Sequence, residues 1–217
     1  MNKLNDYINN ITAVIFDIDD TLYLERDYVR SGFMAIGNAL DNPDFGHYCW
    51  SLFLDGVRGN TFDLALQKFP GTRLTIPEMV EIYRTHRPEI SLCPDARRFI
   101  ESLTCRTGII SDGPVSSQRA KFRALGLLPW IECPLFTGEI GISKPAPAPY
   151  QIVSRTLNTP YEQCVYIGDN PKKDFAGAKS LGMKTIRIRR PQSLHVSTPS
   201  DQNVDAELED FSHFSLF

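Results

Sequence analysis

Two aspartates separated by one residue follow a short apolar segment near the start of the sequence. Asp17 and Asp19 come after residues 12–16, an apolar and β-branched run typical of a strand buried on both faces. Because side chains alternate along a strand, we expect both carboxylates on one side of it and Asp20 on the other. Two neighbouring carboxylates repel unless a cation or a proton lies between them, so this pair suits a hard cation such as Mg²⁺ and an acid/base role. An aspartate-rich strand end also occurs as a simple turn, so the other strand ends must decide.

A serine and a lysine further along the chain suit an anionic ligand. Ser111 ends the run 107–111, and Asp112 begins a turn whose backbone N–H groups can point at an anion. Lys144 is held extended by the proline that follows it and would add a positive charge. At about 4 Å from an anionic oxygen, that charge is worth roughly 4 kcal/mol at an effective dielectric constant near 20. Single serines in turns and single lysines are usually surface residues, so their order along the chain has to carry the interpretation.

Two more aspartates follow a third strand-like run. Asp169 comes directly after residues 164–168, and Asp174 follows within the next turn. With Asp17 and Asp19 they would place four carboxylates at one mouth of a sheet, an arrangement that is costly without a cation. Asp174 has an ordinary alternative role, since an acid in the first turn of a helix complements the helix dipole.

These residues require a fold that brings several strand ends together. Strand-like runs alternate with helical segments, which favours right-handed βαβ units in an open parallel sheet with helices on both faces. In such α/β folds, ligands bind beyond the carboxyl ends of the strands. The expected strands are residues 12–16, 107–111, 164–168 and 184–189, and a helix is expected from residue 171 to about residue 181.

The segment between residues 23 and 92 has a different character, because strand-like runs vanish there. Helices are expected at residues 28–40, 49–54, 61–69 and 77–85, and we interpret them as a helical insert after the first strand. Residues 191–203 are polar, and we expect a mobile connection there before a final packed segment that ends in Phe211, Phe214 and Phe217.

The composition is that of an ordinary globular protein. The 217 residues are 42% hydrophobic and 23% charged, which suits one α/β domain with a smaller insert. A net charge of −3 with mixed signs predicts that no nucleic-acid polymer is a partner. No apolar run is long enough to cross a membrane and residues 1–10 lack a secretory pattern, so we expect a cytoplasmic protein without a membrane partner. Five widely spaced cysteines without a CxxC pair favour neither disulfides nor a zinc site. The oligomeric state is not predicted.

The candidate residues, taken together, resemble the four motifs of the haloacid dehalogenase-like (HAD) hydrolase superfamily. They occur in the same order, as residues 17–21, Ser111, Lys144 and residues 168–174. The DxDxT pattern alone would be only suggestive, whereas all four motifs in order are highly specific. The resemblance covers residues 11–22 and about 93–190, and says little about the helical insert.

This resemblance implies a domain arrangement. It predicts a Rossmann-like catalytic core, with three α/β/α layers, at residues 1–25 and 92–217, and a small α-helical cap domain at residues 26–91. In one large branch of the superfamily, a helical cap stands at this position after the first motif.

The resemblance also implies a mechanism for an Mg²⁺-dependent phosphatase. Asp17 would attack phosphorus and form an aspartyl-phosphate, and Asp19 would protonate the leaving alcohol and then activate water. Mg²⁺ would be held by the Asp17 carboxylate, the Asp19 main-chain carbonyl and Asp169. Asp174 would support the site through water or by orienting a lysine or a ligand.

The remaining motif residues would bind the phosphoryl group of a small phosphorylated metabolite such as a sugar phosphate or a nucleotide. Lys144 and Ser111 would contact its oxygens, and main-chain N–H groups near Ile18 and Asp112 would complete the cradle. Thr21 would brace the loop.

Four other functions are compatible with some or all of these motifs. Haloacid dehalogenases lack the second acid, so Asp19 favours phosphate esters. Phosphonate cleavage requires a cap lysine that forms a Schiff base, and Lys68 is the only lysine of the insert and lies far from the expected loop. A phosphosugar mutase shares all four motifs and is the leading alternative. A non-catalytic binding protein of this fold usually lacks motif residues, whereas none is missing here.

Overall fold

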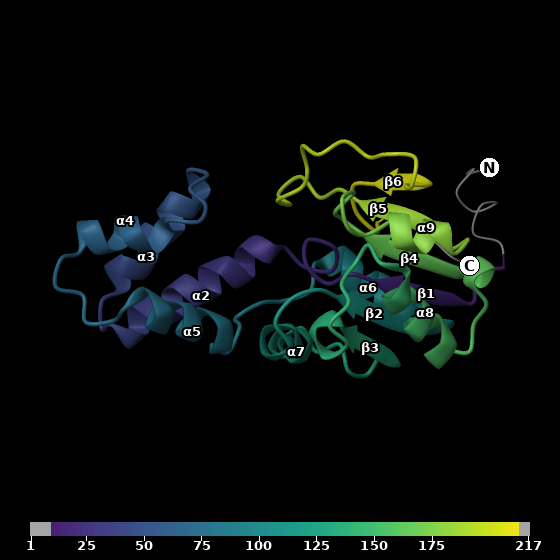
Figure 1. Cartoon of the computed structure of the whole chain (residues 1–217), viewed down its shortest axis with the longest axis horizontal. Coiled ribbons are helices and arrows are strands. Elements are labelled where there is room, and N and C mark those ends of the chain that lie inside the picture. Colours follow the sequence, from purple (N-terminus) through teal and green to yellow (C-terminus); the bar gives the residue numbers. More distant parts are fainter. Residues whose placement is uncertain (1–9, 213–217) are drawn as a thin grey trace. The chain divides into compact units, whose positions relative to one another are not determined.

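The structure of the chain is a computed structural model that describes residues 10–212. The chain divides into two compact units. One consists of the residues up to Glu25 together with those from Ser91 onward, and the other consists of Arg26–Ile90. The first unit contains the sheet, and the second is entirely helical in its regular structure (Figure 1).

The sheet of the first unit has six strands in the order β3-β2-β1-β4-β5-β6, and every neighbouring pair is parallel. The prediction of an open parallel α/β sheet is therefore confirmed. The strands are β1 (Ala13–Phe16), β2 (Arg106–Ser111), β3 (Cys133–Phe136), β4 (Cys164–Gly168), β5 (Lys184–Ile188) and β6 (Ala206–Leu208). The two edge strands, β3 and β6, were not expected from the sequence.

Strand β1 lies in the middle of the sheet and explains why the candidate residues gather. All four of its residues are buried, as expected for an apolar run that packs on both faces. Phe16, its last residue, is paired with Ile109 of β2 and Ile167 of β4. Because the strands are parallel and in register, the residues after β1, β2 and β4 emerge at the same edge of the sheet.

Helices cover both faces of this sheet. One core cluster joins Ile15 of β1 to Tyr150 of α8 and Ala178 of α9, which places these helices on one face. On the other face, Phe16 packs edge-on against Phe99 of α6, with ring centroids 6.1 Å apart. The helices of this unit are α6 (Pro94–Ser102), α7 (Val115–Ala124), α8 (Pro147–Thr156) and α9 (Ala176–Ser180), with 3₁₀ turns at Thr137–Glu139 and Tyr161–Gln163.

The packed segment expected after residues 191–203 is present in the part of the chain that the structure describes, whereas the expected mobility of residues 191–203 stays a prediction. Strand β6 extends the sheet there, and the Phe211 ring, 3% exposed, stacks on Phe99 at 4.7 Å between centroids. Residues 191–203 are hydrogen-bonded to the rest of the first unit: Arg187 donates to the carbonyls of His195 and Thr198, and the Leu194 N–H donates to Asp20. The expected packing of Phe214 and Phe217 lies outside the described residues.

Helix α9 begins later than predicted. The expected start at residue 171 is wrong, since the helix runs only from Ala176 to Ser180. The Asp174 carboxylate accepts hydrogen bonds from the backbone N–H groups of Asp169 and Asn170, and this bond pattern turns the chain before the helix can start.

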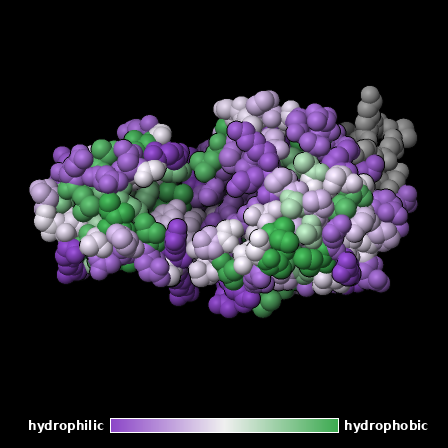
Figure 2. Space-filling view, in the orientation of Figure 1, coloured by the Kyte–Doolittle hydropathy of each residue, from purple (hydrophilic) through white to green (hydrophobic). Residues whose placement is uncertain are grey.

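The helical unit contains α2 (Glu25–Ala39), α3 (Pro43–Leu54), α4 (Thr61–Lys68) and α5 (Ile76–Thr85). The predicted helices are confirmed, although α3 begins earlier than expected, at Pro43, which is favourable in a first turn. The hydrophobic core of the helical unit includes Phe33, Phe45, Cys49 and Met79. Hydrophobic residues also reach the surface of this unit over α3 (Figure 2), where Leu54 is 54% exposed.

None of the helices within the described residues is a candidate membrane span. Within residues 10–212, every helix is too short or too polar to cross a lipid bilayer.

Candidate active site

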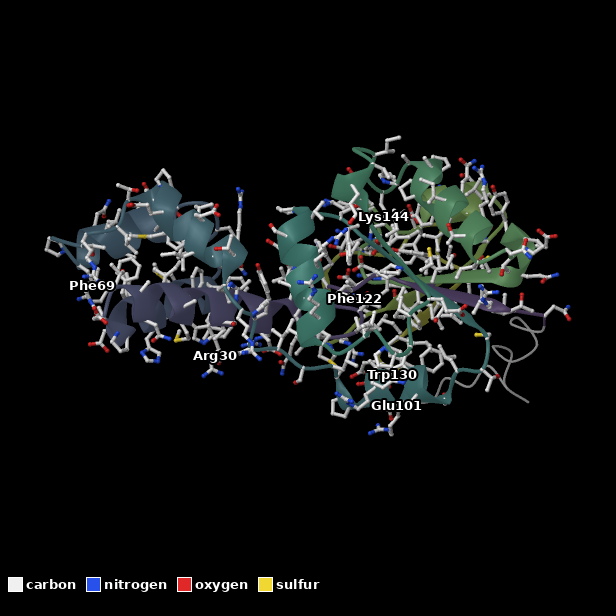
Figure 3. All side chains as sticks on the ribbon, turned by 90° about the horizontal axis from the view of Figure 1, so that it is seen from below. Arg30, Phe69, Glu101, Phe122, Trp130 and Lys144 are labelled. Atoms are coloured by element: carbon white, nitrogen blue, oxygen red, sulfur yellow. The ribbon has the colours of Figure 1, made fainter. Side chains whose placement is uncertain are left out.

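A buried lysine lies between two of the predicted aspartates. The Lys144 Nζ atom is 2.5 Å from Asp17 Oδ1 and 2.7 Å from Asp174 Oδ1, and it is also 3.0 Å from the Tyr166 hydroxyl. The side chain of Lys144, labelled in Figure 3, is only 3% exposed. Burial alone lowers the pKa of Lys144, but Asp17 and Asp174 raise it well above its usual value. The lysine is therefore a permanent positive charge at this edge of the sheet.

Three carboxylates surround this lysine. Asp17, Asp169 and Asp174 each offer an oxygen, and these oxygens lie within 4.8 Å of one another. Burial raises the pKa of Asp17 to about 7, against the effect of Lys144 and with added repulsion from Asp174. Burial likewise raises the pKa of Asp169 well above its usual value, with further repulsion from Asp174 and Asp17. One ammonium does not balance three ionised carboxylates, so without a cation this cluster favours protonation of its aspartates.

One carboxylate oxygen of the cluster has no hydrogen-bond partner and is available to a cation. Asp169 Oδ2 is one of two buried side-chain polar atoms within residues 10–212 that have no hydrogen-bond partner; the other is Thr21 Oγ1. A buried carboxylate oxygen without a donor is costly unless it meets a cation. Several carboxylate oxygens at short mutual distance are the ligands that a hard divalent cation such as Mg²⁺ prefers. The residues present therefore fit the expected Mg²⁺.

The turn after β4 fixes the Asp174 carboxylate. Asp174 Oδ2 accepts hydrogen bonds from the backbone N–H of Asp169 at 3.1 Å and of Asn170 at 2.8 Å. A Cβ added at Gly168 would stand 2.6 Å from the same oxygen, so only glycine leaves room for this arrangement. Asp174 is thus a structural support of the turn and a partner of Lys144, rather than a helix cap.

Asp19 is not part of the carboxylate cluster, because its side chain faces helix α7. Its two oxygens accept hydrogen bonds from Lys121 Nζ at 2.7 and 2.9 Å, and from the Tyr23 hydroxyl. Gln118 Nε2 lies 3.4 Å from Asp19 Oδ2. Asp20 points elsewhere, as expected, and its carboxylate accepts a bond from the backbone N–H of Leu194 at 2.7 Å.

Ser111 and Asp112 lie at the end of β2, next to these groups. The fully buried Ser111 hydroxyl donates to Gln118 Oε1 at 2.9 Å. Asp112 Oδ1 accepts hydrogen bonds from Thr137 Oγ1 at 2.8 Å and from the backbone N–H of Lys144 at 3.2 Å. The Asp112 side chain therefore holds the loop that carries Lys144.

The loop after β1 is held from the far end of the chain. The Thr21 carbonyl accepts hydrogen bonds from two nitrogens of Arg190, at 3.0 and 3.1 Å, and Arg190 also pairs with Asp95 at 2.8 Å. The side chain of Ile18 is fully buried, so only its backbone is available to a ligand.

Several of these partners were missed by sequence reasoning. Gln118 and Lys121 are three residues apart in a helix that starts just after Ser111, and this spacing places them on one helix face. That signal was present, although no motif marked it. Arg190 carried no local signal, since its partners are Thr21 and Asp95, far away in the sequence.

Comparisons with known proteins agree with this geometry. Residues 11–182 match the haloacid dehalogenase-like hydrolase family. The chain is 29% identical to glyceraldehyde 3-phosphate phosphatase of Methanopyrus kandleri, over 92% of this chain and 93% of the relative. It is 26% identical to ribulose-1,5-bisphosphate 5-phosphatase of Halopiger xanaduensis, over 93% and 94%. The crystal structure of 2-haloacid dehalogenase from Pseudomonas syringae pv. Tomato resembles it with a TM-score of 0.64 and 26% identity, over 93% and 95%.

These matches, together with the sheet order, confirm the predicted HAD-like α/β fold and the prediction of a phosphatase enzyme within that superfamily. Since the matched residues 11–182 make up most of the sequence, this chain belongs to the haloacid dehalogenase-like hydrolase family.

Proposed function

We propose that this chain is an Mg²⁺-dependent phosphomonoester hydrolase that acts on a small phosphorylated metabolite through an aspartyl-phosphate on Asp17. The observation that carries the proposal is the position of Asp17 at the carboxyl end of the central strand, 2.5 Å from the ammonium of Lys144 and within a cluster of three buried carboxylates. A nucleophilic carboxylate needs a positive environment that attracts phosphate, and this cluster with a cation supplies one.

The cation would be held by Asp17, Asp169 and the main-chain carbonyl of Asp19, with Asp174 next to it. Asp169 offers the oxygen that has no partner. When bound, Mg²⁺ supplies positive charge that offsets the repulsion between the phosphate and the carboxylates.

The first half of the reaction transfers the phosphoryl group to the protein. A carboxylate oxygen of Asp17 attacks phosphorus, and the bond from phosphorus to the ester oxygen breaks. Asp19 gives its proton to the departing oxygen, which leaves as an alcohol. Lys144 binds phosphoryl oxygens, where negative charge is greatest in the transition state, and Ser111 does so when its hydroxyl turns from Gln118 Oε1 to the phosphoryl group.

The second half returns the protein to its starting state. Asp19, now a carboxylate, takes a proton from water as the water oxygen attacks phosphorus. The bond between phosphorus and the Asp17 oxygen breaks, inorganic phosphate leaves, and both aspartates regain their original protonation.

The substrate class follows from the relatives. The two phosphatases named above act on glyceraldehyde 3-phosphate and on ribulose 1,5-bisphosphate. Because both are hydrolases of small sugar phosphates, they favour hydrolysis of such esters over the mutase alternative. The helical unit, Arg26–Ile90, would serve as the cap that selects the substrate, and a cytoplasmic location stays a prediction.

The proposal is tested by phosphate release from a panel of sugar phosphates, nucleotides, polyol phosphates and an aryl phosphate, with Mg²⁺ and with chelator. We expect release that depends on Mg²⁺ and that disappears in the Asp17→Asn variant. Release that is equal with chelator, or that persists in the variant, would contradict the mechanism. If no ester is hydrolysed, conversion between phosphosugar isomers is the next assay.

A further inference from the structure

The acid/base group of the proposed reaction is held by two side chains of helix α7 and by Tyr23. Lys121 Nζ lies within 2.9 Å of both Asp19 oxygens, and the lysine side chain is only 5% exposed. The Tyr23 hydroxyl donates to Oδ1 of the same carboxylate, and Gln118 Nε2 lies 3.4 Å from Oδ2. A carboxylate with donors on both oxygens has one preferred orientation, since any rotation breaks several hydrogen bonds.

Gln118 joins this carboxylate to the phosphate-binding hydroxyl. Its amide oxygen accepts a hydrogen bond from the buried Ser111 hydroxyl at 2.9 Å, while its amide nitrogen faces Asp19. A Cβ added at Gly113 would stand 2.9 Å from Gln118 Nε2, and Gly113 has a φ of 130°, so glycine is required beside the glutamine. The Gln118 side chain therefore connects the proposed acid/base residue, Asp19, to the proposed phosphate-binding residue, Ser111.

Helix α7, which carries Gln118 and Lys121, packs against strand β3 of the sheet. Phe122, labelled in Figure 3, follows Lys121 directly and is buried against Phe136 of β3, with ring centroids 5.9 Å apart. Gln118 and Lys121 are one turn apart on this helix. The helix thus acts as a rigid support whose position is set by the sheet.

We infer that Lys121 and Gln118 are positioning residues that set the Asp19 carboxylate relative to a phosphoryl group bound at Ser111. This inference rests on the proposed function. A general acid must lie within hydrogen-bond reach of the leaving oxygen, and a displacement of about 1 Å costs on the order of 100-fold in rate.

The inference predicts a dependence on the leaving group. When an alkyl phosphate reacts, the departing oxygen is strongly basic and needs the proton of Asp19 as its bond to phosphorus breaks. When an aryl phosphate such as 4-nitrophenyl phosphate reacts, a stable phenolate departs and needs no proton. Variants that misplace Asp19 should therefore slow the first turnover of the alkyl ester selectively.

The experiment measures alcohol and phenolate release in the first turnover, with Mg²⁺, for wild type and for Lys121→Met, Lys121→Arg and Gln118→Met. We expect alkyl release to slow by about 10-fold to 100-fold in Lys121→Met and Gln118→Met, while aryl release stays within about threefold of wild type. Lys121→Arg should recover most of the alkyl rate, because the guanidinium can still donate to both oxygens. The first turnover is used because Asp19 acts again, as a base, in the second half of the reaction.

The matched control is Lys179→Met, which removes another lysine paired with a carboxylate, that of Asp205, at a partly exposed place outside the site. We expect both esters to react at the wild-type rate in this variant. Equal slowing of alkyl and aryl release by Lys121→Met and Gln118→Met, or slowing of neither, would overturn the inference. If Lys121→Met does not fold, Gln118→Met, which keeps the ion pair, decides in the same way. A wild type that turns over neither ester would instead contradict the proposed function.

Discussion

The Lys144 ammonium lies 2.5 Å from Asp17 and 2.7 Å from Asp174, so one buried charge pairs with the proposed nucleophile and with the residue that shapes the next turn. The lysine side chain and both carboxylates are nearly inaccessible to water. An intact buried ion pair contributes little to the net free energy of unfolding. Removing one partner, however, leaves a buried charge without its counter-charge and destabilises the fold. This relationship makes Lys144 important to folding as well as to the proposed phosphate binding.

Replacing Lys144 should therefore destabilise the protein strongly. In Lys144→Met we expect the free energy of unfolding, measured by urea titration in chelator, to fall by about 3–5 kcal/mol, because buried carboxylates lose their counter-charge. Added Mg²⁺ should restore part of the loss, since a cation replaces the missing charge. Lys179→Met, which breaks a partly exposed pair with Asp205, should cost only about 0–1 kcal/mol. Equal losses in the two variants would show that the buried charge is balanced in another way.

Binding of Mg²⁺ should stabilise the folded state. A cation that binds only the folded chain adds about 2.7 kcal/mol at a concentration of about 100 times its Kd, which raises the midpoint of thermal unfolding. In Asp169→Asn the rise should be mostly lost, because the carboxylate oxygen without a partner is removed. Differential scanning fluorimetry with Mg²⁺ and with chelator measures the thermal midpoints of the wild type and of Asp169→Asn. A wild-type midpoint that does not respond to Mg²⁺ would speak against the metal site.

The two aspartates after β1 should be separable by kinetics. Asp17→Asn is expected to abolish turnover, because a neutral amide is a poor nucleophile, while Asp19→Asn should lower kcat by about 100-fold to 10,000-fold through loss of acid/base catalysis. Asp17→Asn should keep a cooperative thermal transition near that of wild type, because Lys144 still pairs with Asp174. Asp19→Asn should unfold at a lower temperature, because Lys121 loses its buried ion pair with Asp19. Activity at a normal rate in Asp17→Asn would exclude it as nucleophile, and an unchanged kcat in Asp19→Asn would limit Asp19 to its main-chain carbonyl.

Stability should also depend on the protonation of His195. Burial lowers the pKa of His195 below 6.5, and its Nε2 lies 3.0 Å from Asn170 Nδ2, where only the neutral ring can accept a hydrogen bond. Because the unfolded chain takes up this proton at a higher pH than the folded chain does, stability is lost as the pH falls below 6.5.

Urea midpoints measured from about pH 7 to about pH 5 test this dependence. The wild type should lose stability over this range more steeply than His195→Gln, which carries no titrating group at that position. Parallel curves for the two proteins would show that the ring protonates as freely in the folded state as in the unfolded chain.

The sheet and the positions of its aspartates could be predicted because they depend on local patterns. A buried apolar run predicts a strand, parallel strands share an edge for their carboxyl ends, and these two rules place Asp17, Ser111 and Asp169 together. Lys144 required the resemblance to a family, since a lysine before a proline carries no such signal by itself.

Other features could not be predicted because they depend on contacts between distant segments. The late start of α9 follows from the Asp174 carboxylate, which binds the backbone N–H groups of Asp169 and Asn170 and holds the segment before the helix as a turn. Arg187 and Arg190 connect the end of the sheet to the loops that follow β1 and β4, and Arg187 also binds the carbonyls of His195 and Thr198. Polarity along the chain cannot reveal such partners, because many polar segments remain solvated.

The hydrogen bonds from Arg190 to the Thr21 carbonyl have a consequence for the synthesis of the protein. The two residues are 169 positions apart, and the second contact to this loop, from Leu194 to Asp20, spans 174. On the ribosome the reactive loop is made long before the residues that fix it, so a nascent chain that ends before residue 190 carries all four catalytic motifs without a settled loop. The loop after β1 therefore gains these hydrogen bonds only after the residues that follow β5 have been synthesised.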